Sequence, residues 1–451
     1  MDTNRAVVSE REPGSRPPGS GSISAKPTKT RWWILFLISI MYLICYMDRS
    51  NISVAAPEIT KEFGLTKNAM GLVLAAFTWA YALGQVPAGW LGDRFGPKKV
   101  LAVIMSWWAV GATMTGAALG MTSLFSARFL LGLGEAGAFP VASRGMQLWF
   151  AKSERGLIQG TTHFFSRLAV AITPFTAGTI LLAFGWRAIF YIFGSVGVIW
   201  AIAFSFFYRN RPEESKAVNQ AELAQIRGLR PDGTIQQLST VRQPTPWKTI
   251  LGSPNMWFIA FGYCCFFFGT NFYLTWYPTY LREYRHVSLQ SLRFLGSLPL
   301  LAGMVGDLVG GSLSDLVLRR TGNAKFARRI VAAPAFLMAG VFVIPAALTD
   351  TAWLSVVFLA LSFFFLEWVI GPAWAVPMDV GGQFSGTVTG IMNMAGALAA
   401  SLTAIVYGTL FGKGFWVAPF LVSAGVMFLG ALIWTFLIDP ERSVVGPAAQ
   451  S

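Results

Sequence analysis

The sequence predicts an all-α membrane protein whose twelve transmembrane helices form two pseudo-symmetric halves of six. Three observations support this fold class. The 451 residues are 54% hydrophobic and only 12% charged, roughly half the charged fraction of a soluble domain. Apolar runs of about 20 residues, the length that crosses a bilayer, recur twelve times. A polar segment at 209–254 then separates the first six runs from the last six.

The apolar runs define the organisation of the chain. The first set covers 32–56, 68–92, 98–119, 122–147, 156–184 and 187–208. The second set covers 255–281, 290–318, 326–348, 351–376, 383–411 and 415–437. The predicted parts are a disordered cytoplasmic tail (1–31, rich in Ser, Pro, Gly and Arg), a first half (32–208), a cytoplasmic linker (209–254), a second half (255–438) and a cytoplasmic tail (439–451).

The basic residues predict how the chain lies in the membrane. The net charge is +14, but the cations sit in short loops instead of on one polar face, which excludes a nucleic-acid partner. They favour one set of loops, with Arg282, Arg285 and Arg293 as an exception. By the positive-inside rule both termini and the linker are cytoplasmic. The first run is too long for a signal peptide and no cleavage site follows it. A bacterial cytoplasmic membrane fits best, and a eukaryotic membrane stays open.

Ionisable residues interrupt the apolar runs of the first half. A charge at mid-bilayer costs about 2.5–3.5 kcal/mol on insertion scales, so the whole set exposed to lipid would cost on the order of 10 kcal/mol. We therefore expect these side chains to face a cavity or one another. A buried salt-bridge network that only fixes helix packing is the alternative. The residues are Asp48, Arg49, Arg128, Glu135, His163 and Arg167.

Four of these residues are assigned roles. Arg49 is the best candidate for a substrate carboxylate, because a guanidinium is always charged and binds carboxylates through two hydrogen bonds. Asp48 and Glu135 are candidate proton carriers, since a dry site can bring a carboxyl group into exchange near neutral pH. Arg128 lies seven residues before Glu135, nearly two turns along the same helix face. We expect Arg128 to pair with Glu135 in one state and release it in another.

The fifth run and the second half add candidates. His163 and Arg167 are four residues apart and share a helix face. Arg167 is either a second anion contact or the partner of a distant acid. Glu367 is an intramembrane acid, either a titrating site or a packing partner of a basic residue. The remaining predicted substrate-binding residues, for which core or interface packing is the alternative, are Tyr81, Asn271, Tyr273, Trp374 and Asn393.

A weak internal repeat relates the two halves. The second run ends in Gly89-Trp-Leu-Gly-Asp93-Arg94-Phe-Gly-Pro-Lys98-Lys99. The eighth run ends in Gly311-Ser-Leu-Ser-Asp315-Leu-Val-Leu-Arg319-Arg320. In each stretch Gly precedes Asp by four residues and basic residues come next. Matching motifs in two six-helix halves fit a parallel repeat about an axis along the membrane normal.

The stretch at 89–99 resembles the signature loop between spans two and three of the major facilitator superfamily. More narrowly, the chain resembles its anion:cation symporters, which include bacterial hexuronate, galactonate and glucarate carriers, sialin and the vesicular glutamate carriers. The segments that carry this resemblance are Tyr46–Ile52, Phe77–Gln85 and Arg128–Ala136.

The resemblance implies a mechanism. In such carriers matching acidic positions couple proton and anion movement, and the loop aspartate pairs with charge or a helix dipole across the halves to close the cytoplasmic side. It therefore implies gating roles for Asp93 with Arg94, and for Asp315 with Arg319.

Together these points predict a proton-coupled symporter for a small organic anion, such as a hexonate, hexuronate or aldarate, that works by alternating access. We expect it to act as a monomer in the lipid bilayer, without a cofactor or a metal. The alternatives are an exporter or a sodium-coupled carrier of another carboxylate, or a metabolite sensor that does not transport. The tails and linker are short for a signalling domain. An enzyme is disfavoured, because the two histidines and three cysteines form no catalytic or metal-binding motif.

Overall fold

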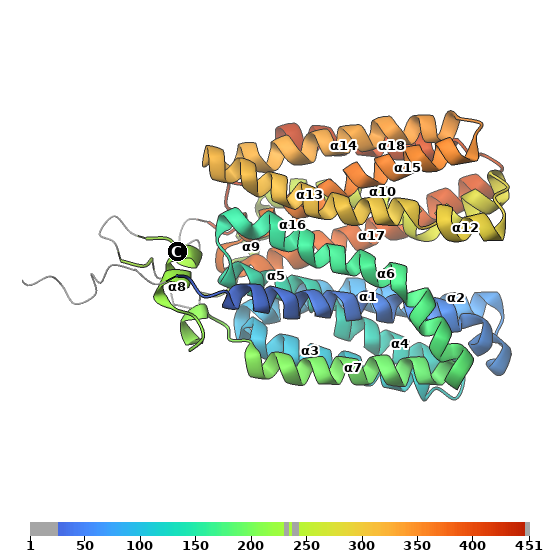
Figure 1. Ribbon diagram of the computed structural model, residues 1–451, viewed down its shortest axis with the longest axis horizontal. Coiled ribbons are helices and arrows are strands. Elements are labelled where there is room, and N and C mark those ends of the chain that lie inside the picture. Colours follow the sequence, from blue (N-terminus) through green and yellow to red (C-terminus); the bar gives the residue numbers. More distant parts are fainter. Residues whose placement is uncertain (1–25, 230–233, 237–242, 447–451) are drawn as a thin grey trace, which may run out of the picture.

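The computed structural model describes residues 26–229, 234–236 and 243–446, and this part of the chain is a bundle of long helices. Figure 1 shows the helices running side by side along the long axis in two groups, blue to green and yellow to red. Most of the predicted N-terminal tail and the last residues, 447–451, lie outside the described residues.

The first half begins at α1 and ends at α7. Its elements are α1 (Thr30–Phe63), α2 (Lys67–Phe95), α3 (Pro97–Gly116), α4 (Met121–Ala136), α5 (Ala138–Trp149), the 3-10 turn η1 (Lys152–Glu154), α6 (Arg155–Phe184) and α7 (Trp186–Phe207).

The linker contains short helical segments, and the second half follows it. The linker elements are η2 (Pro212–Glu214), α8 (Gln220–Arg227) and α9 (Trp247–Gly252). The second half contains α10 (Pro254–Thr275), α11 (Tyr277–Thr279), η3 (Tyr280–Tyr284), α12 (Leu289–Leu295), α13 (Leu298–Thr321), α14 (Ala324–Leu348), α15 (Ala352–Trp368), α16 (Ile370–Val380), η4 (Gly382–Phe384), α17 (Ser385–Gly412), α18 (Ala418–Leu432) and η5 (Ile433–Leu437).

The helices agree with the predicted all-α membrane fold. Eleven helical stretches of the described chain are long and apolar enough to cross a membrane. The 20-residue α3, which carries Lys98 and Lys99 in its first turn, lies beside them as a twelfth. The stretches Met121–Trp149 and Ala352–Val380 each break once, between α4 and α5 and between α15 and α16. The predicted fold class is therefore confirmed.

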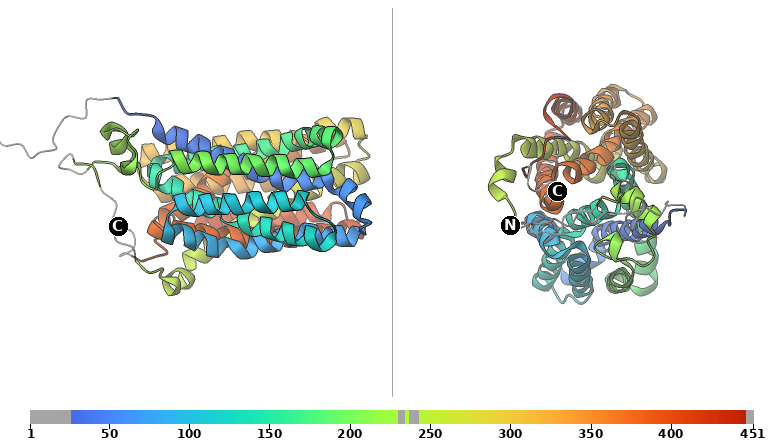
Figure 2. Two further views of the ribbon diagram at one scale, coloured as in Figure 1. Left: turned by 90° about the horizontal axis from the view of Figure 1, so that it is seen from below. Right: turned by 90° about the vertical axis from the view of Figure 1, so that its left-hand side faces the viewer.

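The two halves meet along two helix pairs, α2 with α17 and α6 with α13. Glycines let the backbones touch in both pairs. A Cβ on Gly89 would lie 2.3 Å from the Gly386 oxygen, and a Cβ on Gly156 would lie 2.6 Å from the Gly311 oxygen. Small residues of this kind set the closest approach of membrane helices. Figure 2 shows the halves side by side when the bundle is viewed along its axis.

The linker helices gather at one end of the bundle, which we call the linker end, and the opposite end is the far end (Figure 1). The linker is fixed to α1 there. Glu222 of α8 is buried, and its carboxylate accepts hydrogen bonds from the backbone N–H groups of Thr30 and Arg31 at 3.2 and 2.9 Å. An acid at the first N–H groups of a helix satisfies donors that have no partner within the helix.

Candidate functional site

Arg49 and Glu135 form an ion pair between α1 and α4. Arg49 Nε donates to Glu135 Oε2 at 2.7 Å, and the Cys45 thiol lies 3.1 Å from the same oxygen. The Glu135 side chain is fully buried, whereas 19% of the Arg49 side chain is exposed. In this conformation Arg128 does not pair with Glu135, and the expected exchange of partners between states stays a prediction. Arg128 lies about 10 Å further along the same helix axis, whereas Arg49 reaches Glu135 from a neighbouring helix.

Aromatic rings surround the Arg49 guanidinium. Its central carbon lies 4.1 Å from the ring centre of Tyr81, 5.0 Å from Tyr46, 5.1 Å from Phe139 and 5.5 Å from Phe77. Such contacts stabilise a desolvated cation by about 2 kcal/mol or more. Its Nη2 group is buried and has no hydrogen-bond partner in the described part of the chain. The cation is thus held in place and keeps N–H groups for an anion.

Asp48 and Arg128 flank this pair. Asp48 is buried and accepts hydrogen bonds from Trp108 Nε1 at 2.7 Å and Asn51 Nδ2 at 3.2 Å. Arg128 is buried with its guanidinium carbon 4.9 Å from the ring centre of Phe77. Arg128 Nε and Nη1 have no partner among the described side chains. The structure therefore brings together Asp48, Arg49, Arg128 and Glu135, four of the residues that we predicted for substrate and proton binding in the first half.

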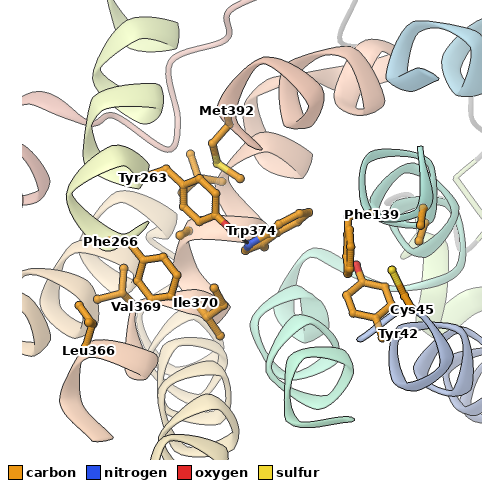
Figure 3. Close-up of a cluster of buried hydrophobic side chains, with 14 of the residues drawn as sticks. Tyr42, Cys45, Phe139, Tyr263, Phe266, Leu366, Val369, Ile370, Trp374 and Met392 are labelled. Carbon is orange, nitrogen blue, oxygen red and sulfur yellow. Dashed lines mark hydrogen bonds between the residues drawn. The ribbon is translucent and has the colours of Figure 1, made fainter. Parts of the chain in front are cut away.

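An aromatic layer crosses from one half to the other (Figure 3). Trp374 lies between Tyr263, whose hydroxyl accepts a hydrogen bond from the indole at 2.8 Å, and the Phe139 ring, 6.1 Å away. Tyr42 packs edge-on against Phe139 at 4.4 Å, and the His163 ring lies 5.0 Å from Trp374. The predicted residue Trp374 is therefore at the interface of the halves.

Of the other predicted substrate-binding residues, some meet across the two halves and others make contacts only within the second half. Asn393 Nδ2 donates to the Tyr81 hydroxyl at 3.2 Å, so these two residues meet across the halves. Asn271 Nδ2 donates to the Ala400 carbonyl at 2.8 Å, within the second half. Tyr273 is buried in the second half with its ring 4.3 Å from that of Phe363.

A further ion pair, between Arg167 and Glu367, joins the two halves. Arg167 Nη2 on α6 lies 2.8 and 2.9 Å from the two carboxylate oxygens of Glu367 on α15, and both residues are buried. Of the interpretations open for Arg167, the structure shows the partner of a distant acid. Asp307 of α13 interacts electrostatically with both residues and is fully buried. We did not predict Asp307, although its place in an apolar run carries the same insertion cost.

Asp93 binds the start of a helix in the other half. Its carboxylate accepts hydrogen bonds from the Gly386 N–H at 2.9 Å and from the Thr387 N–H and hydroxyl, both at 2.7 Å. Arg144 Nε lies 3.8 Å away. The exposed N–H groups of a helix N-terminus favour an anion, so Asp93 holds α17 against α2 at the linker end.

Asp315, in the second half, likewise binds the start of a helix in the first half. It accepts hydrogen bonds from the Gly156 and Leu157 N–H groups at 3.0 and 2.7 Å, at the start of α6. Arg328 Nη1 lies 2.7 Å from Asp315 Oδ1. The two aspartates are therefore equivalent in the two halves, as the sequence repeat indicates.

Arg94 and Arg319, which we predicted as gating residues together with these aspartates, do not contact the aspartate carboxylates. Arg94 follows Asp93 directly and so points about 100° away, and its guanidinium lies 5.2 Å from the ring centre of Trp90. Arg319 is exposed and reaches only the backbone oxygen of Asp315, at 3.4 Å. The cations near the carboxylates come from other helices, Arg144 from α5 and Arg328 from α14.

Further polar contacts that we did not predict close the linker end. Arg155 Nη1 lies 2.8 Å from Asp379 Oδ1, and Gln147 Nε2 donates to the Met378 carbonyl at 2.6 Å. Within the described ranges, no hydrogen bond or ion pair joins the halves at the far end. Arg155 and Asp379 sit next to loops, where spacing alone gives no signal for a cross-half contact.

The described residues contain no group of three or more His, Cys, Asp or Glu side chains that could hold a metal ion. A cavity of about 1430 Å³ lies at the linker end, between the polar contacts of the halves and the linker. Its lining includes Asp93, Arg144, Asp379, Arg227 and Trp247.

Comparisons with known proteins agree with this geometry. Residues 38–404 match the family model described as Major Facilitator Superfamily. The chain is 40% identical, over 93% of its length and 96% of the relative, to a probable sulfoacetate transporter of Cupriavidus necator. It is 32% identical to a probable galactarate/D-glucarate transporter of Escherichia coli, over 94% and 97% of the two chains. The solved structure of a proton:xylose symporter superimposes with a TM-score of 0.72 over 92% and 98% of the chains, at 13% identity.

Proposed function

Because the chain belongs to the major facilitator superfamily and, within it, to the anion:cation symporters, we propose that it imports a small organic anion together with protons. It is a membrane transporter of organic anions and not an enzyme. One observation carries the finer proposal. The Arg49 guanidinium, inside the membrane bundle, is held by one carboxylate and four rings and keeps a buried N–H group without a partner. A substrate carboxylate would satisfy that group.

The transport cycle follows from the polar contacts between the halves. If the linker end is cytoplasmic, as the loop charges predict, this conformation is closed toward the cytoplasm. Substrate would enter from the far end and reach Arg49. Rocking of the halves would then close the far end and break the contacts that Asp93 and Asp315 make with the opposite half. The same contacts would re-form when the empty carrier returns.

Glu135 provides a way to couple anion and proton. With Glu135 ionised, its pair with Arg49 is neutral. An incoming carboxylate competes with Glu135 for the same guanidinium, and a proton on Glu135 removes that competition. The loaded site is then neutral again. If Asp48 carries a second proton, import of a monoanion moves one net positive charge inward, and the membrane potential adds about 2.3 kcal/mol per 100 mV.

The substrate proposal is a sugar acid, with a compact sulfocarboxylate as the second candidate. The galactarate/D-glucarate relative supports the first and the sulfoacetate relative supports the second. Two contacts suit a dianion, which both the aldarates and a sulfocarboxylate are. The Arg49 and Arg128 guanidiniums both lie near the Phe77 ring, at 5.5 and 4.9 Å, and Arg128 keeps two unused nitrogens. A small dianion could place one acidic group at each arginine.

Uptake into proteoliposomes tests the proposal. Purified protein would be reconstituted with an outside-acid pH gradient and offered radiolabelled sulfoacetate, galactarate, glucarate, galactonate and glucuronate. We expect accumulation of at least one of these anions above its outside concentration, abolished by a protonophore. Accumulation driven by a sodium gradient instead of the pH gradient would mean that the coupling ion is sodium and not the proton. No accumulation or exchange of any organic anion, with folded protein in the vesicles, would overturn the proposal.

A further inference from the structure

Arg167, Glu367 and Asp307, which we call the bridge triad, lie together where α6 packs on α13 and α13 packs on α15. The backbones approach closely at this level. A Cβ on Gly160 would lie 2.2 Å from the Asp307 carbonyl oxygen, and a Cβ on Gly306 would lie 3.3 Å from the Glu367 Cβ. All three members of the triad are at most 2% exposed.

The bridge triad contains one more acid than base. Glu367 uses both oxygens to hold Arg167 Nη2, at 2.8 and 2.9 Å. Asp307 is buried, and neither of its carboxylate oxygens accepts a hydrogen bond from an N–H or hydroxyl donor of the described residues; the carboxyl group that it faces is that of Glu367. Buried polar atoms are rarely left in this state, and a change of protonation is one explanation for a carboxyl group without a donor.

The titratable groups around the bridge triad do not supply a second fixed cation. Arg328, which α14 contributes, lies at the linker end and pairs there with Asp315. The nearer groups are the hydroxyls of Tyr46 from α1 and Tyr273 from α10 and the imidazole of His163 from α6. The His163 Nδ1 atom is already hydrogen-bonded to the Gln159 carbonyl at 2.9 Å. A proton on one carboxyl group would balance the excess acid.

We propose that the bridge triad is a proton-binding site separate from Asp48 and Glu135, and that it carries one proton in each transport cycle. This inference rests on the proposed symport function. With Asp307 protonated, Arg167 and Glu367 form a neutral pair that ties α6 of the first half to α15 of the second. When the proton leaves, both acids compete for one guanidinium and the tie between the halves weakens. Proton release at the bridge triad is thereby coupled to movement of the halves.

The proton-to-anion ratio tests this site. In proteoliposomes the ratio follows from the pH gradient that balances a fixed anion gradient at zero net flux. We would compare the natural protein with Asp307→Asn, Glu367→Gln and the control Asp350→Asn, which changes an exposed aspartate in the turn after α14. Each of the first two substitutions leaves one acid for Arg167. We expect both to lower the ratio by one proton, and the control to keep it.

The possible outcomes separate the two proposals. An unchanged ratio in either folded acid variant would overturn the proton site, and the second variant decides if the first does not fold. Uptake driven by a sodium gradient and lost in Asp307→Asn would also overturn it, because the triad would then bind sodium. If the natural protein transports no anion under any pH gradient, the proposed symport function itself fails.

Discussion

The linker end and the surroundings of Arg49 both contain buried charges, but the hydrogen bonds and ion pairs of these charges differ between the two regions. At the linker end the acids are engaged with the opposite half. Asp93 accepts three hydrogen bonds, Asp315 accepts two backbone bonds and an arginine, and Asp379 contacts two arginines. Around Arg49 the charges lie within one half, and Arg49 Nη2, two nitrogens of Arg128 and Glu135 Oε1 have no partner in the described chain.

This contrast separates two uses of charge inside a membrane. A charge whose bonds are complete and cross the halves stabilises one conformation, because movement of the halves breaks those bonds. A cation whose bonds are incomplete within a rigid half stays in the same place through the cycle and keeps donors for a ligand. We therefore attribute conformational locking to Asp93 and Asp315, and substrate binding to Arg49. The predictions below test that division, starting with the largest effect.

Removal of the Arg49 side chain should have the largest effect. Each charge-assisted hydrogen bond is worth about 1.5–3 kcal/mol, so Arg49→Ala should weaken anion binding by about 100-fold or more and abolish both uptake and exchange. Arg49→Lys keeps the charge but loses the planar N–H pattern, and we expect at least about 10-fold weaker binding. Initial uptake rates in proteoliposomes measure both. Arg320→Gln, at an exposed arginine that ends α13, is the control. Normal affinity in Arg49→Ala would place the anion elsewhere.

Substitution of Glu135 should separate two activities, accumulation driven by a pH gradient and exchange of anions across the membrane. Glutamine keeps the shape of the side chain and a carbonyl oxygen for Arg49 Nε, but it cannot release a proton. We expect Glu135→Gln to lose accumulation driven by a pH gradient while anion exchange across the membrane continues. Counterflow and gradient-driven uptake in the same vesicles distinguish the two activities. Glu58→Gln, at an exposed glutamate of α1, should retain both. Uphill uptake by Glu135→Gln would assign proton coupling to other acids.

Neutralising the linker-end aspartates should have an intermediate effect. Asp93→Asn or Asp315→Asn removes the anion from a helix N-terminus and from charge-assisted bonds, worth about 1.5–3 kcal/mol. We expect the linker end to open more often, so a cysteine placed at buried Ser143 in a background without native cysteines should react with a polar thiol reagent about 10-fold faster. Arg94→Gln and Arg319→Gln should change this rate less, because neither arginine contacts the carboxylates. Equal effects of all four substitutions would mean that Arg94 and Arg319 contribute to gating as much as the two aspartates do.

The sequence predicts the helices and the charged residues better than it predicts their contacts. Apolar runs of bilayer length reveal the helices, and insertion cost identifies Arg49 and Glu135 as functional candidates. Pairing was harder to predict. Asp315 binds Arg328 of another helix instead of the nearby Arg319, because the register between neighbouring helices is set by packing and not by spacing along one helix. Asp307 carries the same insertion cost as the other intramembrane acids, but its neighbours Glu367 and Arg167 lie on other helices, so spacing along the chain does not reveal the cluster.

The smallest effect should follow substitution of Asn271, which we predicted from sequence as a substrate-binding residue. Its amide N–H group is used by the Ala400 carbonyl at 2.8 Å, which ties α10 to α17 inside one half. Asn271→Ala should cost about 1 kcal/mol of stability and raise the KM for uptake less than about fivefold. Asn393→Ala, which breaks the bond to Tyr81 across the halves, should change transport more. Thermal unfolding and uptake kinetics of both variants test this order. A KM effect for Asn271→Ala that exceeds the effect of Asn393→Ala would mean that the free carbonyl oxygen of Asn271 contacts the substrate, and that bonded residues of the second half also belong to the binding site.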